Sequence, residues 1–167
     1  SRGGKLQALK IKAIHNADTR NWEKENFLKN QKYDIDWIPL KNVDNPEDDL
    51  RYRAADKGAA FFARPEGMWY DDDIIYFTCT SGGYTKLGQI WKLDVIKQTL
   101  ELMFESKNSA VMKACDNITI APWGDVIVCE DGKGKDRLIG IKPNGTTYTI
   151  AENYLNNGSS CLSILTE

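Results

Sequence analysis

The feature that most constrains the fold is an internal repeat in the second part of the chain. A displacement of 51 residues brings Ile75 onto Val126, Cys79 onto Glu130 and Glu66 onto Asn117. With a few residues dropped in the following loops, residues 89–93 fall on 137–141 and residues 99–105 fall on 146–152. Each copy holds four short strands within about 45–50 residues, the length of a β-propeller blade.

The repeat predicts an all-β fold of about three four-stranded propeller blades in an incomplete ring, with one short helix. A blade buries its faces only against neighbours, so the chain is expected to be a fragment of a larger propeller or to self-associate through its open edges. An ordinary β-sandwich with a chance repeat is the alternative. The predicted divisions are an irregular first blade with a helical insert (1–58), two blades (59–113 and 114–153), and the start of a further blade or a tail (154–167).

The remaining elements follow from local patterns. Alternating apolar and polar residues predict strands at 5–14 and 33–40. Asn45-Pro46 followed by acidic residues is a helix-start signal, so a short helix is expected over about 47–57, ending at Gly58. Further strands are expected at 74–80, 88–93, 99–105, 117–121, 126–130, 138–142 and 146–151.

Composition excludes several classes of function. The hydrophobic fraction of 41% is enough for a core, and a formal net charge of -2 gives no attraction toward nucleic acid or an anionic membrane. The longest apolar runs, such as 74–77, are too short to span a bilayer. The chain starts at Ser1 and no signal peptide is visible.

The cysteines and the single histidine form no known catalytic or metal-binding motif. The four cysteines form no C-x-x-C pair, so a structural zinc site is not expected, and buried thiols are the simpler interpretation. His15 is the only histidine, and no G-x-S-x-G motif accompanies it. A surface position is expected for His15.

Acidic residues recur where a propeller would gather them. The first strand of each blade lines the central channel, so residues that open these strands converge on one axis. Glu66, Asp116 and Asn117 open two such strands and offer the oxygen ligands that calcium prefers. At the ends of the second strands, Glu130 and Asp131 add carboxylates, and Cys79 adds a softer ligand that suits iron or another transition metal. Turn chemistry is the alternative explanation for Asp131-Gly132 and for Asp116-Asn117.

The same segments, taken in order, resemble the PhoX family of alkaline phosphatases. No single tetrapeptide carries the resemblance, which rests on the ordered set from about residue 59 to 153 and, less specifically, on residues 1–22. The segments are Arg64-Pro65-Glu66-Gly67, Ile75-Tyr76-Phe77-Thr78, Gly88-Gln89-Ile90-Trp91, Asp116-Asn117-Ile118-Thr119, Pro122-Trp123-Gly124 and Cys129-Glu130-Asp131-Gly132.

The resemblance implies an exported, periplasmic or extracellular propeller phosphatase that acts on small phosphate monoesters. It implies calcium together with iron as metals, with Glu66 and Glu130 at metal-ligand positions. Arg64 becomes a candidate for binding phosphate, because a guanidinium matches two phosphate oxygens. The family's full site draws ligands from more blades than this chain holds, so a complete site is not expected from these residues alone.

Two other functions remain open at this point. A lactonase-like propeller of the SMP-30 kind would use the Pro65-Glu66-Gly67 segment to hold a single divalent ion. A non-catalytic propeller would bind a partner and no metal.

Overall fold

The computed structural model describes residues 4–154. It contains ten strands and one helix, in the order β1 (Gln7–Ile11), β2 (Lys32–Pro39), α1 (Leu50–Asp56), β3 (Pro65–Asp71), β4 (Ile74–Cys79), β5 (Gln89–Asp94), β6 (Thr99–Glu105), β7 (Cys115–Ile120), β8 (Val126–Glu130), β9 (Arg137–Ile141) and β10 (Thr147–Glu152). The prediction of an all-β fold with one short helix is confirmed. The expected further blade or tail after Tyr154 lies outside the described residues.

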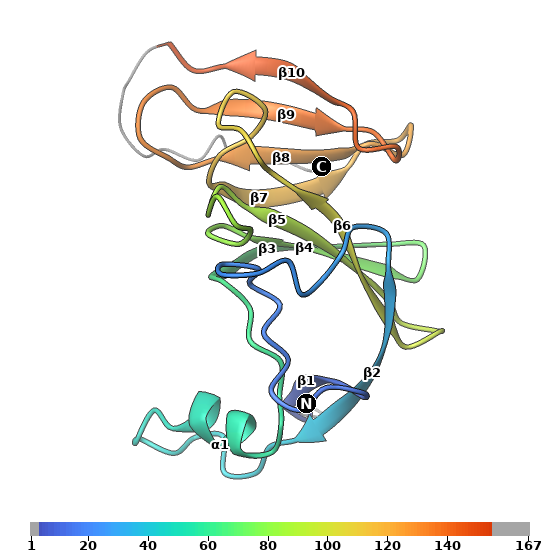
Figure 1. Cartoon of the computed structure of the whole chain (residues 1–167), viewed down its shortest axis with the longest axis vertical. Coiled ribbons are helices and arrows are strands. Elements are labelled where there is room, and N and C mark those ends of the chain that lie inside the picture. The colour runs from blue at the N-terminus through green and yellow to red at the C-terminus, as the bar shows by residue number, and fades with distance from the viewer. Residues whose placement is uncertain (1–3, 155–167) are drawn as a thin grey trace.

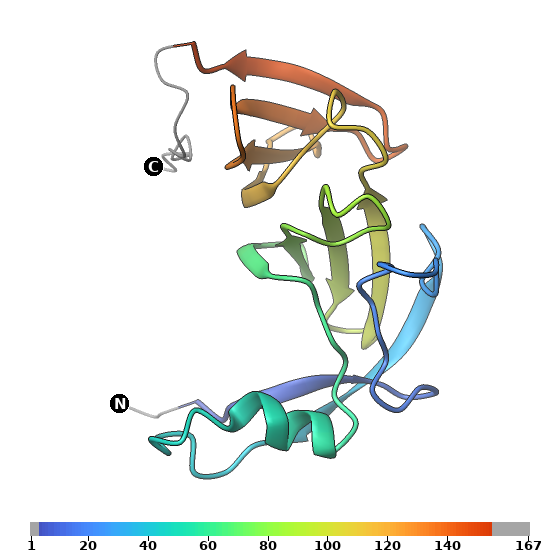
Figure 2. The ribbon, with the colours of Figure 1, turned by 60° about the vertical axis from the view of Figure 1, so that its left-hand side comes forward.

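The strands form two antiparallel sheets. The first has the order β1-β2-β6-β5-β4-β3, and the second has the order β10-β9-β8-β7. Both sheets are curled and follow one another as a half-barrel, with β3 and β7 on the inner side of the arc (Figure 1, Figure 2). Two like sheets stacked in sequence are consistent with neighbouring propeller blades, whose class and number stay a prediction.

The N-terminal strands extend the first sheet. β2 pairs with β6 through residues 32–34 and with β1 through residues 35–39. The helix α1 begins at Leu50, later than expected, because Asp48 has a left-handed backbone (φ 48°) that a helix cannot include. His15 is exposed, as predicted.

The core lies on both faces of the first sheet. One face packs against the second sheet through Trp69, Tyr76 and Ile90, which meet a fully buried set on β7–β9: Ile118, Val126, Val128, Ile139 and Ile141. The other face packs against the N-terminal segments, with Trp91 and Phe27 in edge-to-face contact at 5.9 Å. Burial of these apolar side chains supplies the main driving force for the fold.

Strand pairing confirms the repeat for the last three strands of each copy. Phe77 pairs with Trp91 in the first sheet, and Val128 pairs with Ile139 in the second. These partners are the ones that the predicted alignment makes equivalent. The pairing of β6 and β10 follows the alignment as well.

The first strand departs from that alignment by one residue. Met68 pairs with Phe77, whereas Ile118 pairs with Val128, so β3 and β7 are related by a displacement of 50 residues and not 51. The turn after β7 is longer: residues 122–124 stand where the first sheet has only Asp72-Asp73, both with left-handed backbones. The longer turn absorbs the extra residue.

This difference changes which polar residues correspond. Glu66 is equivalent to Asp116, and the predicted equivalence of Glu66 with Asn117 is wrong. Each of these acids lies in a β-bulge, since the pairing shifts between Pro65 and Met68 and again between Cys115 and Ile118. A bulge re-aims side chains and leaves residues without ladder partners, which is common beside functional sites.

Candidate functional site

All of the predicted site residues lie at one end of the two sheets. At this end β3 and β7 begin and β4 and β8 finish, because Pro65 pairs with Cys79 and Cys115 pairs with Glu130. The topology therefore gathers these residues at one end of both sheets. Their burial and their partners differ greatly, and this decides what each can do.

Arg64 and Glu66 form an exposed ion pair at the start of β3. Their side chains meet at 3.1 Å and are 67% and 37% exposed. Arg64 has a left-handed backbone (φ 51°), and its carbonyl accepts the Thr80 N–H at 3.0 Å. The equivalent residue Ala114 shares both features, with φ 43° and a bond from the Asp131 N–H at 2.9 Å. The strained backbone thus belongs to the repeated architecture, and the exposed guanidinium is what distinguishes Arg64.

The backbone of Gly67, next to Glu66 in β3, lies against the start of β7 at Asp116 and Asn117. A Cβ atom at Gly67 would lie 2.5 Å from the Asp116 carbonyl oxygen and 2.7 Å from the Asn117 Cα. The two bulges therefore touch backbone to backbone. Asp116 is half-buried and Asn117 is exposed.

The Thr78 hydroxyl joins the two bulges. It accepts the Gly67 N–H at 3.0 Å and donates to the Asp116 carbonyl at 2.6 Å. Thr78 is fully buried, so both bonds are shielded from water. The hydroxyl thus fixes the spacing between the start of β3 and the start of β7.

We expect Thr78→Val to lower the free energy of unfolding by about 1–3 kcal/mol, because it leaves the Gly67 N–H and the Asp116 carbonyl unpaired in a buried place. Urea unfolding followed by circular dichroism measures this loss. Thr149→Val on the exposed side of β10 is the matched control and should change stability by less than about 0.5 kcal/mol. Equal stability of the two variants would show that the hydroxyl bridge contributes nothing.

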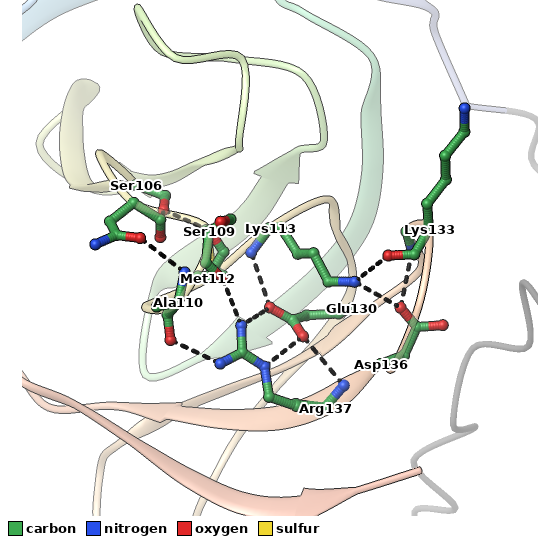
Figure 3. Close-up of polar contacts among 11 residues, drawn as sticks. Ser106, Ser109, Ala110, Met112, Lys113, Glu130, Lys133, Asp136 and Arg137 are labelled. Carbon is green, nitrogen blue, oxygen red and sulfur yellow. Dashed lines mark hydrogen bonds and ion pairs between the residues drawn. The ribbon is translucent and has the colours of Figure 1, made fainter. Parts of the chain in front are cut away.

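Glu130 is completely buried and surrounded by donors (Figure 3). Its Oε1 accepts from the Lys113 N–H at 2.8 Å and from Arg137 Nη2 at 2.7 Å. Its Oε2 accepts from Arg137 Nε at 2.8 Å and from the Arg137 N–H at 3.1 Å. The side-chain hydrogen bonding to Glu130 makes the largest contribution to the raised pKa of the Arg137 guanidinium.

Asp131 and Thr80 occupy equivalent places, one residue beyond β8 and β4. Asp131 Oδ1 and Thr80 Oγ1 are both buried, and neither has a hydrogen-bond partner within residues 4–154. Thr80 is only 4% exposed. Asp131 was predicted as a ligand, and Thr80 is its counterpart in the repeat, with a buried oxygen in the same situation.

Cys79 does not fit the place expected for an iron ligand. Its side chain is fully buried in the apolar core of the first sheet. Burial raises the pKa of the Cys79 thiol to about 12, so the thiol is protonated at neutral pH. Because the thiolate is the form that binds metal, Cys79 acts as a core residue in this structure.

The residues beside the Gly67 contact have the ligand types of a calcium site. Glu66 precedes Gly67 on β3, and the backbone of Gly67 contacts the backbone of Asp116 and Asn117, whose carboxylate and amide groups are oxygen ligands of the kind calcium binds. Within the described part of the chain, no group of three or more His, Cys, Asp or Glu residues is placed to hold a metal ion. Calcium binding thus needs oxygens beyond the acidic residues gathered here, from backbone, amide groups or water.

None of the helices within residues 4–154 is long and apolar enough to cross a membrane.

Comparisons with curated proteins and with solved structures find no match. Comparison with models of protein families matches residues 1–163, nearly the whole chain, to the family described as alkaline phosphatase PhoX. The chain therefore belongs to the PhoX family of alkaline phosphatases.

Proposed function

We propose that the chain is a metal-dependent phosphatase of phosphate monoesters, or part of one, built on propeller blades. The observation that carries the proposal is the contact between the two bulges at Gly67. This contact supports a shared site for the exposed pair Arg64 and Glu66 and for Asp116 and Asn117, at one end of adjacent sheets. Membership in the PhoX family supports the phosphatase chemistry.

Each residue has a distinct role in this proposal. Arg64 binds the phosphoryl group, because its guanidinium is exposed and its one ion-pair partner among the described residues, Glu66, is itself exposed. Glu66, Asp116, Asn117 and Asp131 offer oxygens to calcium. Calcium, when bound, neutralises phosphoryl oxygens and activates water. Iron lacks a fitting ligand in Cys79, so no role for it is assigned to these residues.

The proposal also concerns where and with what the protein acts. Small phosphorylated molecules are the proposed substrates, and the periplasm or the extracellular space is the proposed location. Self-association through open sheet edges remains a further proposal, supported by the outer strand β10, which pairs on one side with β9. These points rest on family membership and on the topology.

Glu66→Gln tests the metal role directly. The substitution keeps the size of the side chain and removes its charge, so we expect calcium affinity to fall at least about tenfold. Hydrolysis of p-nitrophenyl phosphate in saturating calcium should fall with it. Calorimetric titration with calcium and a rate assay on the full chain measure the two effects.

Asp72→Asn is the matched control, since Asp72 is an exposed acid at the opposite end of β3. It should leave calcium affinity and hydrolysis unchanged. Absence of phosphate release by the full-length protein loaded with calcium and iron would overturn the phosphatase proposal. Hydrolysis of a lactone substrate to its hydroxy acid in its place would favour the single-metal alternative.

A further inference from the structure

Glu130 lies in a place where family resemblance expects a metal ligand, yet its surroundings are those of a fixed structural group. We infer that Glu130 is a positioning residue: its carboxylate anchors the connector of residues 106–114 and thereby places Asp116. This inference rests on the proposed function and deepens it, because it states which acid of the site holds metal and which one holds the site together.

The carboxylate of Glu130 has no acceptor capacity left for a metal. An ionised carboxylate offers about four lone-pair sites. Four donors at 2.7–3.1 Å fill them, two from the Arg137 side chain and two from backbone N–H groups. The Glu130 side chain is 0% exposed, so a metal would have to displace buried, charge-assisted bonds to reach it.

Arg137 extends the anchor into the connector. Its Nη1 donates to the Ala110 carbonyl at 2.7 Å, and its Nη2 donates to the Ser109 carbonyl at 2.8 Å. Glu130 itself accepts the Lys113 N–H. The Glu130–Arg137 ion pair therefore ties the connector to the β8–β9 hairpin at three residues, Ser109, Ala110 and Lys113 (Figure 3).

The connector leads straight into the candidate site. Ala114 follows Lys113, and its left-handed backbone turns the chain into β7. Its carbonyl accepts the Asp131 N–H at 2.9 Å. Cys115 and Asp116 come next, and the Asp116 carbonyl accepts the Thr78 hydroxyl. A shift of the connector would therefore move the Asp116 bulge relative to Glu66.

The Lys113 side chain reinforces the anchor by binding the turn after β8. Lys113 Nζ donates to the Lys133 carbonyl and lies 3.8 Å from Asp136 Oδ1. The Asp136 carboxylate also accepts the Gly132 N–H at 2.9 Å. The turn after β8 is thus held on both sides, and Glu130 is the carboxylate at its base.

Glu130→Gln separates the two roles because it keeps shape but places an amide NH₂ against groups that are themselves donors. A positioning role predicts that the unfolding temperature falls by about 5 °C, and equally in EDTA and in calcium. A ligand role predicts a deficit that is larger in calcium than in EDTA, because bound calcium would stabilise the wild type through the carboxylate that the variant lacks.

Amide hydrogen exchange in EDTA gives a local readout that a general loss of stability would not reproduce. We expect at least about tenfold faster exchange at Lys113, Ala114 and Asp116 in Glu130→Gln, with unchanged exchange in the turn at residues 71–73. Glu47→Gln, on an exposed acid before α1, is the control and should change neither readout.

Unchanged exchange at the connector, or an unfolding temperature in EDTA equal to that of the wild type, would overturn the inference. Neither measurement in EDTA, the unfolding temperature or the amide hydrogen exchange, requires metal binding or catalysis. Failure of the phosphatase proposal would therefore leave this result intact, and failure here would leave the phosphatase assay to be judged separately.

Discussion

Arg137→Met is expected to destabilise the protein by about 3–5 kcal/mol, the largest effect of any single change considered. The substitution keeps most of the apolar stem but removes the guanidinium from a carboxylate that is 0% exposed. Glu130 would retain only the two backbone donors, from Lys113 and Arg137. A buried charge that loses its partner costs far more than the pair contributes when intact.

The matched control is Arg51→Met, which breaks the ion pair of Arg51 with Asp48. The two side chains of that pair are 62% and 82% exposed. An exposed pair is screened by water, so the control should cost no more than about 0.5–1 kcal/mol. Urea unfolding of both variants at pH 7 measures the difference. Equal losses would mean that the Glu130–Arg137 pair is as well solvated in solution as a surface pair.

The double variant Glu130→Gln with Arg137→Met sharpens the result. If the two side chains act as one unit, the double variant should be more stable than the sum of the single losses predicts, because no unpaired charge remains. The coupling energy should exceed about 1 kcal/mol, as for residues in one network. Additive losses would indicate that each side chain acts through other partners.

Most strands of the two copies could be predicted from the sequence because the repeat indicates them twice, whereas β3, at Pro65–Asp71, overlaps residues 70–73 that were predicted as a turn. A strand such as β8 was expected at residues 126–130 and has those bounds. Local pattern and repeat agree there, and agreement across levels is what makes a prediction dependable. The first strands were harder to align, because a turn can absorb one residue without disturbing the sheet behind it.

The roles of the acidic residues could be predicted only in part. Sequence placed Glu66 and Glu130 in one class, as acids at strand ends. Burial and partners divide them: Glu66 is exposed beside Arg64, whereas Glu130 is enclosed by Arg137 and the connector. The cross-strand position of Arg137, at the start of β9 opposite the end of β8, was the available signal. Recognising it requires the strand register, which spacing alone does not supply.

The role of Gly67 is the clearest case of information that lies only in tertiary structure. In the sequence it appears as the glycine of an Arg-Pro-Glu-Gly segment that opens a strand. Its backbone needs no left-handed conformation, so no turn demands glycine there. What demands it is the neighbouring sheet, whose backbone at residues 116–118 occupies the space a side chain would fill.

Gly67→Ala is accordingly expected to cost about 3 kcal/mol, at the upper end of the usual range for overpacking. The added methyl would meet the Asp116 oxygen at 2.5 Å, the Asn117 Cα at 2.7 Å and the Ile118 nitrogen at 2.9 Å. All three are backbone atoms at the β7 bulge, so no side-chain rotation can relieve the clash. The start of β7 must move away from β3, and the Thr78 bridge must lengthen with it.

The movement has a consequence for the site as well as for stability. Separating the bulges moves Asp116 away from Glu66, so calcium affinity should fall in Gly67→Ala even under conditions where the variant is fully folded. Gly4→Ala is the control, since a methyl there meets no atom within 4 Å. Urea unfolding and calcium titration measure both effects. Wild-type stability in Gly67→Ala would show that the two sheets do not meet at this glycine, and would remove the observation on which the proposed site depends.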